Sequence, residues 1–315
     1  TGDLTIVTGE FDAEGNLIEA VDTIGGRNGI YAYNNGSGAL SITTMGTTTG
    51  TSGAGIYAKI DNTASTGNLT INAATTTGSH SGIRAINEGD GALSITTTGT
   101  TTADGEDGDV LVSGINALNF GTDLTINAAT TTGGYRGIDA INLGTGDLTI
   151  TAGTTKTTAD EDFSGDGLTF LNSGISAINS GKNLTITADK TYGFSNGIRA
   201  QNRGAGALSI TTTGETTGTD GDGIFAINSA TGTDLTINAD TTTGGENGIV
   251  AINSGTGALS ITTTGKTTGT SRDGIFAING EVNVPIRNNA IAGTDLTINA
   301  ATTKGGDYGI YAKNS

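Results

Sequence analysis

The chain has few of the residues that most often carry chemistry. Its 315 residues include no cysteine, no tryptophan, one proline and one histidine. Without cysteine there is no disulfide framework, no thiolate zinc site and no cysteine nucleophile. A single histidine cannot build a multi-histidine metal cluster. We therefore expect no cofactor and no resident metal ion.

Basic residues are scarce as well. Fourteen Lys and Arg stand against 31 Asp and Glu, which gives a net charge of −17 and a pI near 4.1. An acidic surface of this kind repels phosphate backbones, so we expect no nucleic-acid partner. No apolar run approaches the roughly 18 residues that a membrane-spanning helix needs. We expect no direct membrane insertion of this segment.

The chain is rich in glycine, with 54 residues, and its apolar residues recur regularly. High glycine content can indicate disorder, but the regular spacing opposes that interpretation. Two short patterns alternate from end to end, each eleven times. Leu-Thr/Ser-Ile begins at Leu4, Leu40, Leu69, Leu93, Leu124, Leu148, Leu184, Leu208, Leu235, Leu259 and Leu296. Gly-Ile-x-Ala contains Ile30, Ile56, Ile83, Ile115, Ile138, Ile175, Ile198, Ile224, Ile249, Ile275 and Ile310.

The alternation inside each pattern predicts strands. Leu208 and Ile210 flank a polar Ser209, which is the period of a β-strand, and the frequent glycines oppose helix. A unit of roughly 24 residues with two or three short strands cannot bury its apolar side alone, but stacked units can. The sequence therefore predicts an all-β, single-stranded parallel β-helix of about eleven coils, on the order of 53 Å long at ~4.8 Å per coil.

Glycine and asparagine mark the corners of the predicted coil. We expect the corner glycines to supply positive φ, and the Asn residues that end ten of the eleven Gly-Ile-x-Ala units to stack their amides along the rod. Ile60 interrupts the Asn series, and we expect a loop there. The isoleucine after the Ala is exposed if the strand alternates strictly, or buried if the strand bends. The sequence leaves both possibilities open for Ile86, Ile141, Ile178, Ile227, Ile252 and Ile278.

The repeat predicts one continuous domain over residues 1–315. Insertions are expected at 9–28, 60–66, 101–113, 155–173 and 280–292, where the spacing of the repeat lengthens. No distinct capping segment is evident at either end, although solenoids need caps. We therefore expect a fragment of a longer solenoid, or a chain that stacks end to end.

Several residues invite a catalytic or metal-binding interpretation. The acidic insertions, residues 104–109 and 160–162, lack the EF-hand register, so we expect solvated loops rather than calcium sites. His80 beside Ser79 is expected to be a surface residue. An acidic column, with members mostly two coils and roughly 10 Å apart, fits neither the ~5 Å nor the ~6.5–9.5 Å carboxylate spacing of glycosidases. It comprises Asp3, Asp123, Asp147, Asp234 and Asp295. We expect no enzyme.

The position after the repeated Ile forms an outward column. Arg84 and Arg199 occupy it, too far apart to share one site. Its aromatic members gather toward the two ends, and exposed aromatic residues can bind sugar or protein. The alternative is ordinary strand propensity on an exposed face. The candidate binding face consists of Tyr31, Tyr57, Phe225, Phe276 and Tyr311.

The recurring Gly-Thr-Asp-Leu-Thr-Ile, Gly-Ala-Leu-Ser-Ile-Thr-Thr-Thr-Gly and Gly-Ile-x-Ala-x-Asn elements resemble the passenger repeats of bacterial autotransporters over essentially the whole chain. The resemblance implies a right-handed β-helix that is secreted across the outer membrane to the cell surface. It also implies a structural, adhesive rod that binds glycan or protein on host, matrix or neighbouring cells, or associates with itself. A polysaccharide-degrading β-helix is the alternative. Ice binding through threonine arrays is less favoured, because Lys156, Glu215 and Lys266 interrupt the Thr runs.

Overall fold

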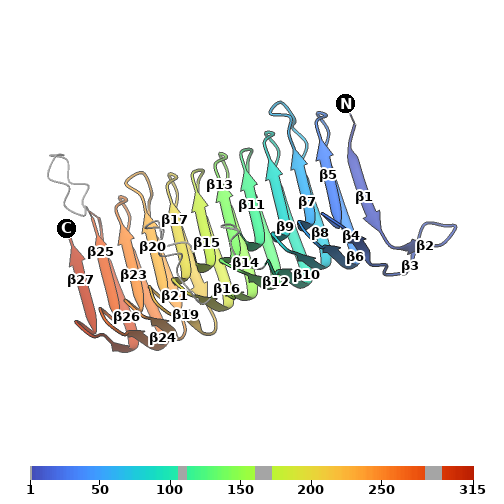
Figure 1. The fold of residues 1–315 in the computed structure, drawn as a ribbon. Helices are drawn as coiled ribbons and strands as arrows, with labels where there is room; N and C mark the ends of the chain where they lie inside the picture. The colour runs from blue at the N-terminus through green and yellow to red at the C-terminus, as the bar shows by residue number, and fades with distance from the viewer. Residues whose placement is uncertain (1, 106–111, 160–171, 281–292) are drawn as a thin grey trace.

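The chain winds into an elongated rod, with successive strands stacked from one end to the other (Figure 1). The computed structural model describes residues 2–105, 112–159, 172–280 and 293–315. The fold is a parallel β-helix, as the repeat predicts, and it is right-handed, as the resemblance to autotransporter passengers implies. Its eleven coils each contribute one strand to an 11-stranded sheet, and a second sheet of 14 strands lies against it.

The 14-stranded sheet is built by the Leu-Thr/Ser-Ile segments. Each is followed by the Thr-rich segment, either within the same strand or as a short separate strand. The two parts meet at a bend, where the register shifts between Thr44 and Thr47 in one coil and between Thr263 and Lys266 in another. The strands are β1 (Leu4–Thr8), β4 (Thr23–Gly25), β6 (Leu40–Gly50), β8 (Leu69–Gly78), β10 (Leu93–Ala103), β12 (Leu124–Gly133), β14 (Leu148–Thr157), β16 (Leu184–Gly193), β18 (Leu208–Thr212), β19 (Thr216–Gly218), β21 (Leu235–Ala239), β22 (Thr242–Gly244), β24 (Leu259–Gly269) and β26 (Leu296–Lys304).

The 11-stranded sheet is built by the Gly-Ile-x-Ala segments. Its strands lie in chain order along the rod, and every neighbouring pair is parallel. They are β5 (Ile30–Asn34), β7 (Ala54–Ile60), β9 (Ser81–Asn87), β11 (Ser113–Asn119), β13 (Arg136–Asn142), β15 (Ser173–Asn179), β17 (Asn196–Asn202), β20 (Ile224–Asn228), β23 (Ile249–Asn253), β25 (Ile275–Asn279) and β27 (Ile310–Asn314).

Like residues stack on like residues throughout the core. Leu124 pairs with Leu148, Ile126 with Ile150, and Ala117 with Ala140. The Leu and Ile side chains of the inner coils are fully buried, and the Ala column is at most 1 % exposed between Ala32 and Ala277. The narrow interior explains why one apolar position is always Ala. The predicted register is confirmed.

The corner glycines serve a different purpose from the one expected. In the described part of the chain only Gly15 and Gly280 have positive φ, so the expectation that corner glycines supply positive φ is wrong. Close approach between coils explains the glycine before the repeated Ile instead. A Cβ on Gly137 would lie 2.6 Å from the carbonyl oxygen of Gly174, and a Cβ on Gly248 would lie 2.5 Å from the carbonyl oxygen of Gly274. No side chain fits there.

The terminal asparagines of the Gly-Ile strands form a buried amide ladder. In each link the Nδ2 of one Asn donates to the Oδ1 of the Asn one coil further along, over 2.9–3.1 Å. This confirms the predicted stacking. The ladder joins Asn87, Asn119, Asn142, Asn179, Asn202, Asn228, Asn253 and Asn279.

Ile60 separates the ladder from Asn34. The expected loop begins only after it, because Ile60 is the last residue of β7, is fully buried and pairs with Asn34 and Asn87. The isoleucines after the Ala fit neither possibility fully, because they stay within the alternating strand but none of them is exposed. They occupy the outward position, where Ile86 is 9 % exposed, Ile278 is 7 % exposed and the others are half-buried.

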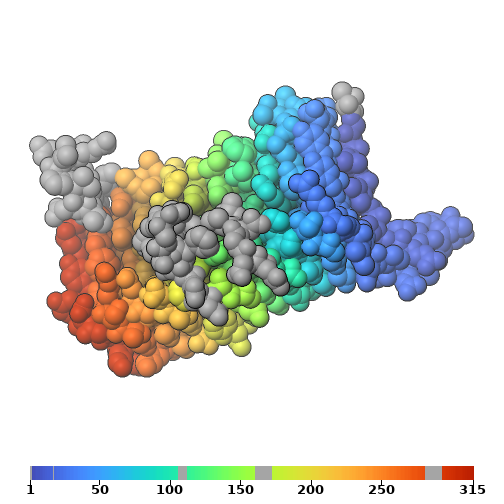
Figure 2. Space-filling model, viewed as in Figure 1, coloured from blue at the N-terminus to red at the C-terminus, as the bar shows by residue number. Residues whose placement is uncertain are grey.

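The insertions interrupt the chain without breaking the stack. Within 9–28, the antiparallel pair β2 (Glu10–Phe11) and β3 (Leu17–Glu19) projects from the N-terminal end of the rod (Figure 2), and β4 rejoins the sheet beside β6. Strands β10 and β14 continue to Ala103 and Thr157, so the regular coil extends into two of the expected insertions. Parts of three expected insertions, 101–113, 155–173 and 280–292, lie outside the described part of the chain. These parts are residues 106–111, 160–171 and 281–292.

Candidate functional site

The aromatic residues of the candidate binding face form two separate stacks. The rings of Tyr31 and Tyr57 lie 5.0 Å apart and 6° from parallel, and those of Phe276 and Tyr311 lie 5.0 Å apart and 7° from parallel. Phe225 lies apart from Phe276, because Val250 occupies the rung between them. One stack lies toward each end of the 11-stranded sheet.

The middle of the same column is polar. Asp139 is only 3 % exposed and accepts hydrogen bonds from Arg136 (2.6 Å) and Asn116 (3.2 Å). Burial lowers the pKa of Arg199, and the nearby Arg136 lowers it further. The aromatic residues therefore do not form one continuous stripe, and any aromatic binding surface is confined to the ends.

A hollow of about 380 Å³ adjoins the Tyr31–Tyr57 stack. Three consecutive coils build it, each with a corner segment and an outward side chain on the following strand. The first coil contributes Tyr31, which is 61 % exposed on the edge strand β5. The lining residues are Arg27, Asn28 and Tyr31 from the first coil, Ser52, Gly53, Ala54 and Tyr57 from the second, and His80, Ser81 and Arg84 from the third.

Contacts between coils hold this hollow in place. The Oδ1 of Asn28 accepts the backbone N–H of Ala54 at 2.9 Å, and the Ser52 hydroxyl donates to the carbonyl oxygen of Gly26 at 2.9 Å. The guanidinium carbon of Arg84 lies 5.8 Å from the centre of the Tyr57 ring, which is cation–π distance. Tyr57 is therefore sandwiched between Tyr31 and Arg84, its neighbours in register.

The charge of the hollow contrasts with the rest of the molecule. In the described part of the chain no ion pair joins Arg27 or Arg84 to a carboxylate, whereas Lys59 pairs with Asp61 and Glu88. The hydrogen bond from Lys59 holds the pKa of Asp61 below its usual range. Two guanidinium groups thus face solvent around two stacked tyrosines on a chain of net charge −17.

Sequence reasoning found Tyr31 and Tyr57 but did not assign Arg27, His80 or Arg84 to the same site. The sequence did predict that Arg84 occupies the outward position after the repeated Ile. Arg27 and His80 lie in corners that precede different strands, and insertions of unequal length separate the coils. Ser79 Oγ lies 3.1 Å from His80 Nδ1 in the same corner. Only the stacking register brings these residues together.

The acidic column caps the backbone. The Oδ1 of Asp123 accepts the backbone N–H of Asp147 at 2.8 Å, and the Oδ1 of Asp147 accepts that of Asn183 at 2.9 Å. Asp3 and Asp234 make the same bond to an Ala of the next coil, each at 2.8 Å. Asp123 and Asp147 lie in neighbouring coils, so the expected spacing of two coils is wrong for this pair. These four carboxylates have a structural role at the corner before the Leu strand of their coils.

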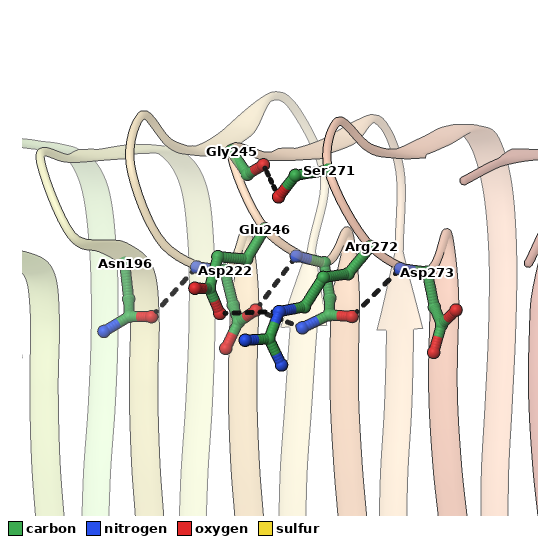
Figure 3. A network of polar contacts seen from close by, with 8 residues as sticks. Asn196, Asp222, Gly245, Glu246, Ser271, Arg272 and Asp273 are labelled. Carbon is green, nitrogen blue, oxygen red and sulfur yellow. Dashed lines mark hydrogen bonds and ion pairs between the residues drawn. The ribbon is translucent and has the colours of Figure 1, made fainter. Parts of the chain in front are cut away.

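A second polar ladder runs along the corner before the Gly-Ile strands (Figure 3). Asn196 Oδ1 accepts the N–H of Asp222, Asp222 Oδ1 accepts the N–H and Nδ2–H of Asn247, and Asn247 Oδ1 accepts the N–H of Asp273, all within 3.1 Å. Burial raises the pKa of Asp222, which is 7 % exposed. Arg272 and Glu246 form a looser ion pair beside this ladder, at 3.5 Å.

The described residues contain no cluster of three or more acidic or histidine side chains able to hold a metal ion. The acidic insertions considered for calcium lie mostly outside the described part of the chain, at 106–109 and 160–162. No helix in the described ranges is long and apolar enough to cross a membrane. Comparison with protein-family models, with curated proteins and with solved structures finds no match to this chain.

Proposed function

We propose that this chain is a structural and adhesive rod, of the kind that autotransporter passengers display at the bacterial surface. The observation that carries the proposal is the hollow beside Tyr31 and Tyr57, a preformed aromatic surface on a regular solenoid. Loops and side faces displayed on a rigid scaffold are where binding usually resides. The bound partner is glycan or protein on host, matrix or neighbouring cells.

The proposed role is non-catalytic. The carboxylates that a polysaccharide-degrading β-helix would use are bonded to backbone N–H groups, as at Asp123 and Asp147. A reducing-sugar assay and an unsaturated-uronate assay on acidic polysaccharides address the enzymatic alternative. We expect no turnover above that of buffer, and robust turnover would replace the adhesive proposal with the enzymatic one.

Adhesion is tested with beads coated with the purified chain. We expect the coated beads to bind epithelial cells, matrix-coated plates or bacterial cells several-fold better than beads coated with albumin. The double variant Tyr31→Ala/Tyr57→Ala should lose most of that binding, and Phe120→Ala, at an exposed aromatic residue in the corner after β11 and outside both stacks, is the matched control. Clumping of the coated beads alone indicates self-association. Binding no better than that of albumin on every surface overturns the proposal.

A second candidate function, ice binding, is favoured by one observation. Lys156, Glu215 and Lys266 all lie after the bend of their coil. The Leu-x-Ile-x segment before the bend carries no charge on its outward positions in any coil. Apart from Val7, these positions are Thr, Ser or Asn, in two columns. Thermal hysteresis well above that of an albumin control would support this function, and none at millimolar concentration would exclude it.

A further inference from the structure

The hollow beside Tyr31 and Tyr57 concentrates positive charge on a strongly acidic chain. Only 14 residues of the chain are Lys or Arg. Two of them, Arg27 and Arg84, line this hollow, are exposed, and are not ion-paired within the described ranges. The planar guanidinium group binds a carboxylate through two parallel hydrogen bonds. These two guanidinium groups therefore suit a ligand that carries an anionic group.

The aromatic wall adds a flat apolar surface next to that charge. Tyr31 and Tyr57 stack rigidly on consecutive rungs, and Tyr31 lies on the edge strand with 61 % of its surface exposed. Rigid tyrosines offer apolar contact together with a hydroxyl at low cost in conformational entropy. A sugar ring, which has apolar C–H faces and polar edges, fits this combination better than a simple inorganic anion does.

Hydroxyl and amide groups complete the lining. The hydroxyl of Ser52 and the side chain of Asn28 are fixed by bonds to the backbone of neighbouring coils. The oxygen of Ser52 can still accept a hydrogen bond from a ligand hydroxyl. The volume of about 380 Å³ is near the lower end of the range for small-molecule sites. This size suits one or two sugar units.

We infer that this hollow binds a saccharide unit that bears a carboxylate, with Arg27 and Arg84 on the carboxylate and the tyrosines against the ring. The inference rests on the proposed adhesive function and names its ligand class. The net charge of −17 repels long polyanions. The ligand is therefore a terminal acidic sugar rather than a repeating acidic chain.

The test compares two probes that differ in one group, methyl β-D-glucuronide and methyl β-D-glucoside. Isothermal titration calorimetry at low salt should give tighter binding of the glucuronide by about tenfold, the ratio that corresponds to the roughly 1.5 kcal/mol of one charge-assisted hydrogen bond. Arg27→Gln and Arg84→Gln should each reduce that preference at least several-fold. Tyr57→Ala should weaken the binding of both probes.

The matched control is Arg199→Gln. Arg199 occupies the same outward column as Arg84 but stands between Ser176 and Phe225, away from the tyrosine stack. We expect this variant to bind the glucuronide as the unchanged chain does, and we expect every variant to remain folded, as measured by circular dichroism. An equal loss in Arg199→Gln would overturn the inference, because it would indicate a general charge effect.

Two further outcomes separate this inference from the proposed function. Adhesion by the coated beads without any preference for the glucuronide overturns the acidic-sugar inference and leaves the adhesive role standing. A glucuronide preference that depends on Arg27 and Arg84, without bead adhesion, overturns the adhesive role and supports the sugar site. Failure of both probes to bind at millimolar concentration also overturns the inference.

Discussion

Asn142 donates from its Nδ2 to the Oδ1 of Asn179 over 3.0 Å, although 37 positions separate the two along the chain. Asn142 also donates to the carbonyl oxygen of Gly146 and accepts the N–H of Gly144, both at 3.3 Å. The buried amide is thus hydrogen-bonded within its own coil and to the next coil. The long insertion between the two asparagines leaves their relationship the same as in coils without an insertion.

Removal of one asparagine from this ladder should lower the stability of the folded chain. We expect Asn142→Ala to lower the free energy of unfolding by about 2–4 kcal/mol, because it removes one hydrogen bond from each buried amide of Asn119 and Asn179 and leaves the N–H of Gly144 without its acceptor. Asn34→Ala is the matched control. Among the described residues the side chain of Asn34 bonds only to Gly36, Gly38 and Ala39 of its own coil, so we expect a loss of about 1 kcal/mol. Urea unfolding followed by circular dichroism measures both, and equal losses would argue against the ladder.

The glycines that precede the repeated Ile should not tolerate an added methyl group. We expect Gly137→Ala to lower the free energy of unfolding by about 1–3 kcal/mol, since the added Cβ would press against the carbonyl oxygen of Gly174. A Cβ on Gly26 would meet nothing within 4 Å, so Gly26→Ala should change stability by less than about 0.5 kcal/mol. Thermal denaturation of the two variants compares these sites. A harmless Gly137→Ala would mean that the coils can separate to admit the methyl group.

Threonines inside the coil carry buried hydroxyls. Thr131 is fully buried and its Oγ1 has no hydrogen-bond partner among the described residues. We expect Thr131→Val to raise the free energy of unfolding by about 1 kcal/mol, because valine keeps the shape and removes the unsatisfied group. Thr130→Val, at the half-exposed neighbour, should have little effect. A loss of stability in Thr131→Val, measured by urea unfolding, would contradict this account.

Asp222 should make the rod less stable as pH rises. Burial raises its pKa in the folded state, whereas the unfolded carboxyl titrates near 3.9. Between these pKa values the folded state holds more protons, so stability falls as pH increases and the loss is complete above the folded pKa. We expect Asp222→Asn, which matches Asn196 and Asn247, to raise the melting temperature at pH 7 and to remove this part of the pH dependence. Asp220→Asn, at an exposed carboxylate, is the control. An unchanged pH profile in Asp222→Asn would argue against the buried charge.

The regular part of the fold was predictable because the repeat itself encodes it. Leu124 and Leu148 share a position in the sequence pattern, and stacking follows from the need of each unit to bury its apolar side. The purpose of Gly137 was not predictable, since a recurring glycine signals equally a positive φ or a close approach. The sequence also did not show on which side of the bend Lys156 lies, because that depends on where the strand bends.

The candidate site was predictable only in part. The aromatic residues Tyr31 and Tyr57 share one position of the repeat, so their stacking followed from the register. Arg27 and His80 lie in corners outside the repeated pattern, 53 positions apart along the chain. Corner conformation is set by contacts between coils, which a single sequence does not display.

The direction of the strands has a mechanical consequence. The strands of the two stacked sheets run across the rod, so the hydrogen bonds between coils point along its axis (Figure 1). A pull on the two ends loads the rungs of the outermost coil first and peels coils off one after another. Each coil of roughly 24 residues releases about 80 Å of chain at ~3.4 Å per residue. Force spectroscopy should record a series of such steps, so that tension on the rod is dissipated in small increments rather than in a single rupture.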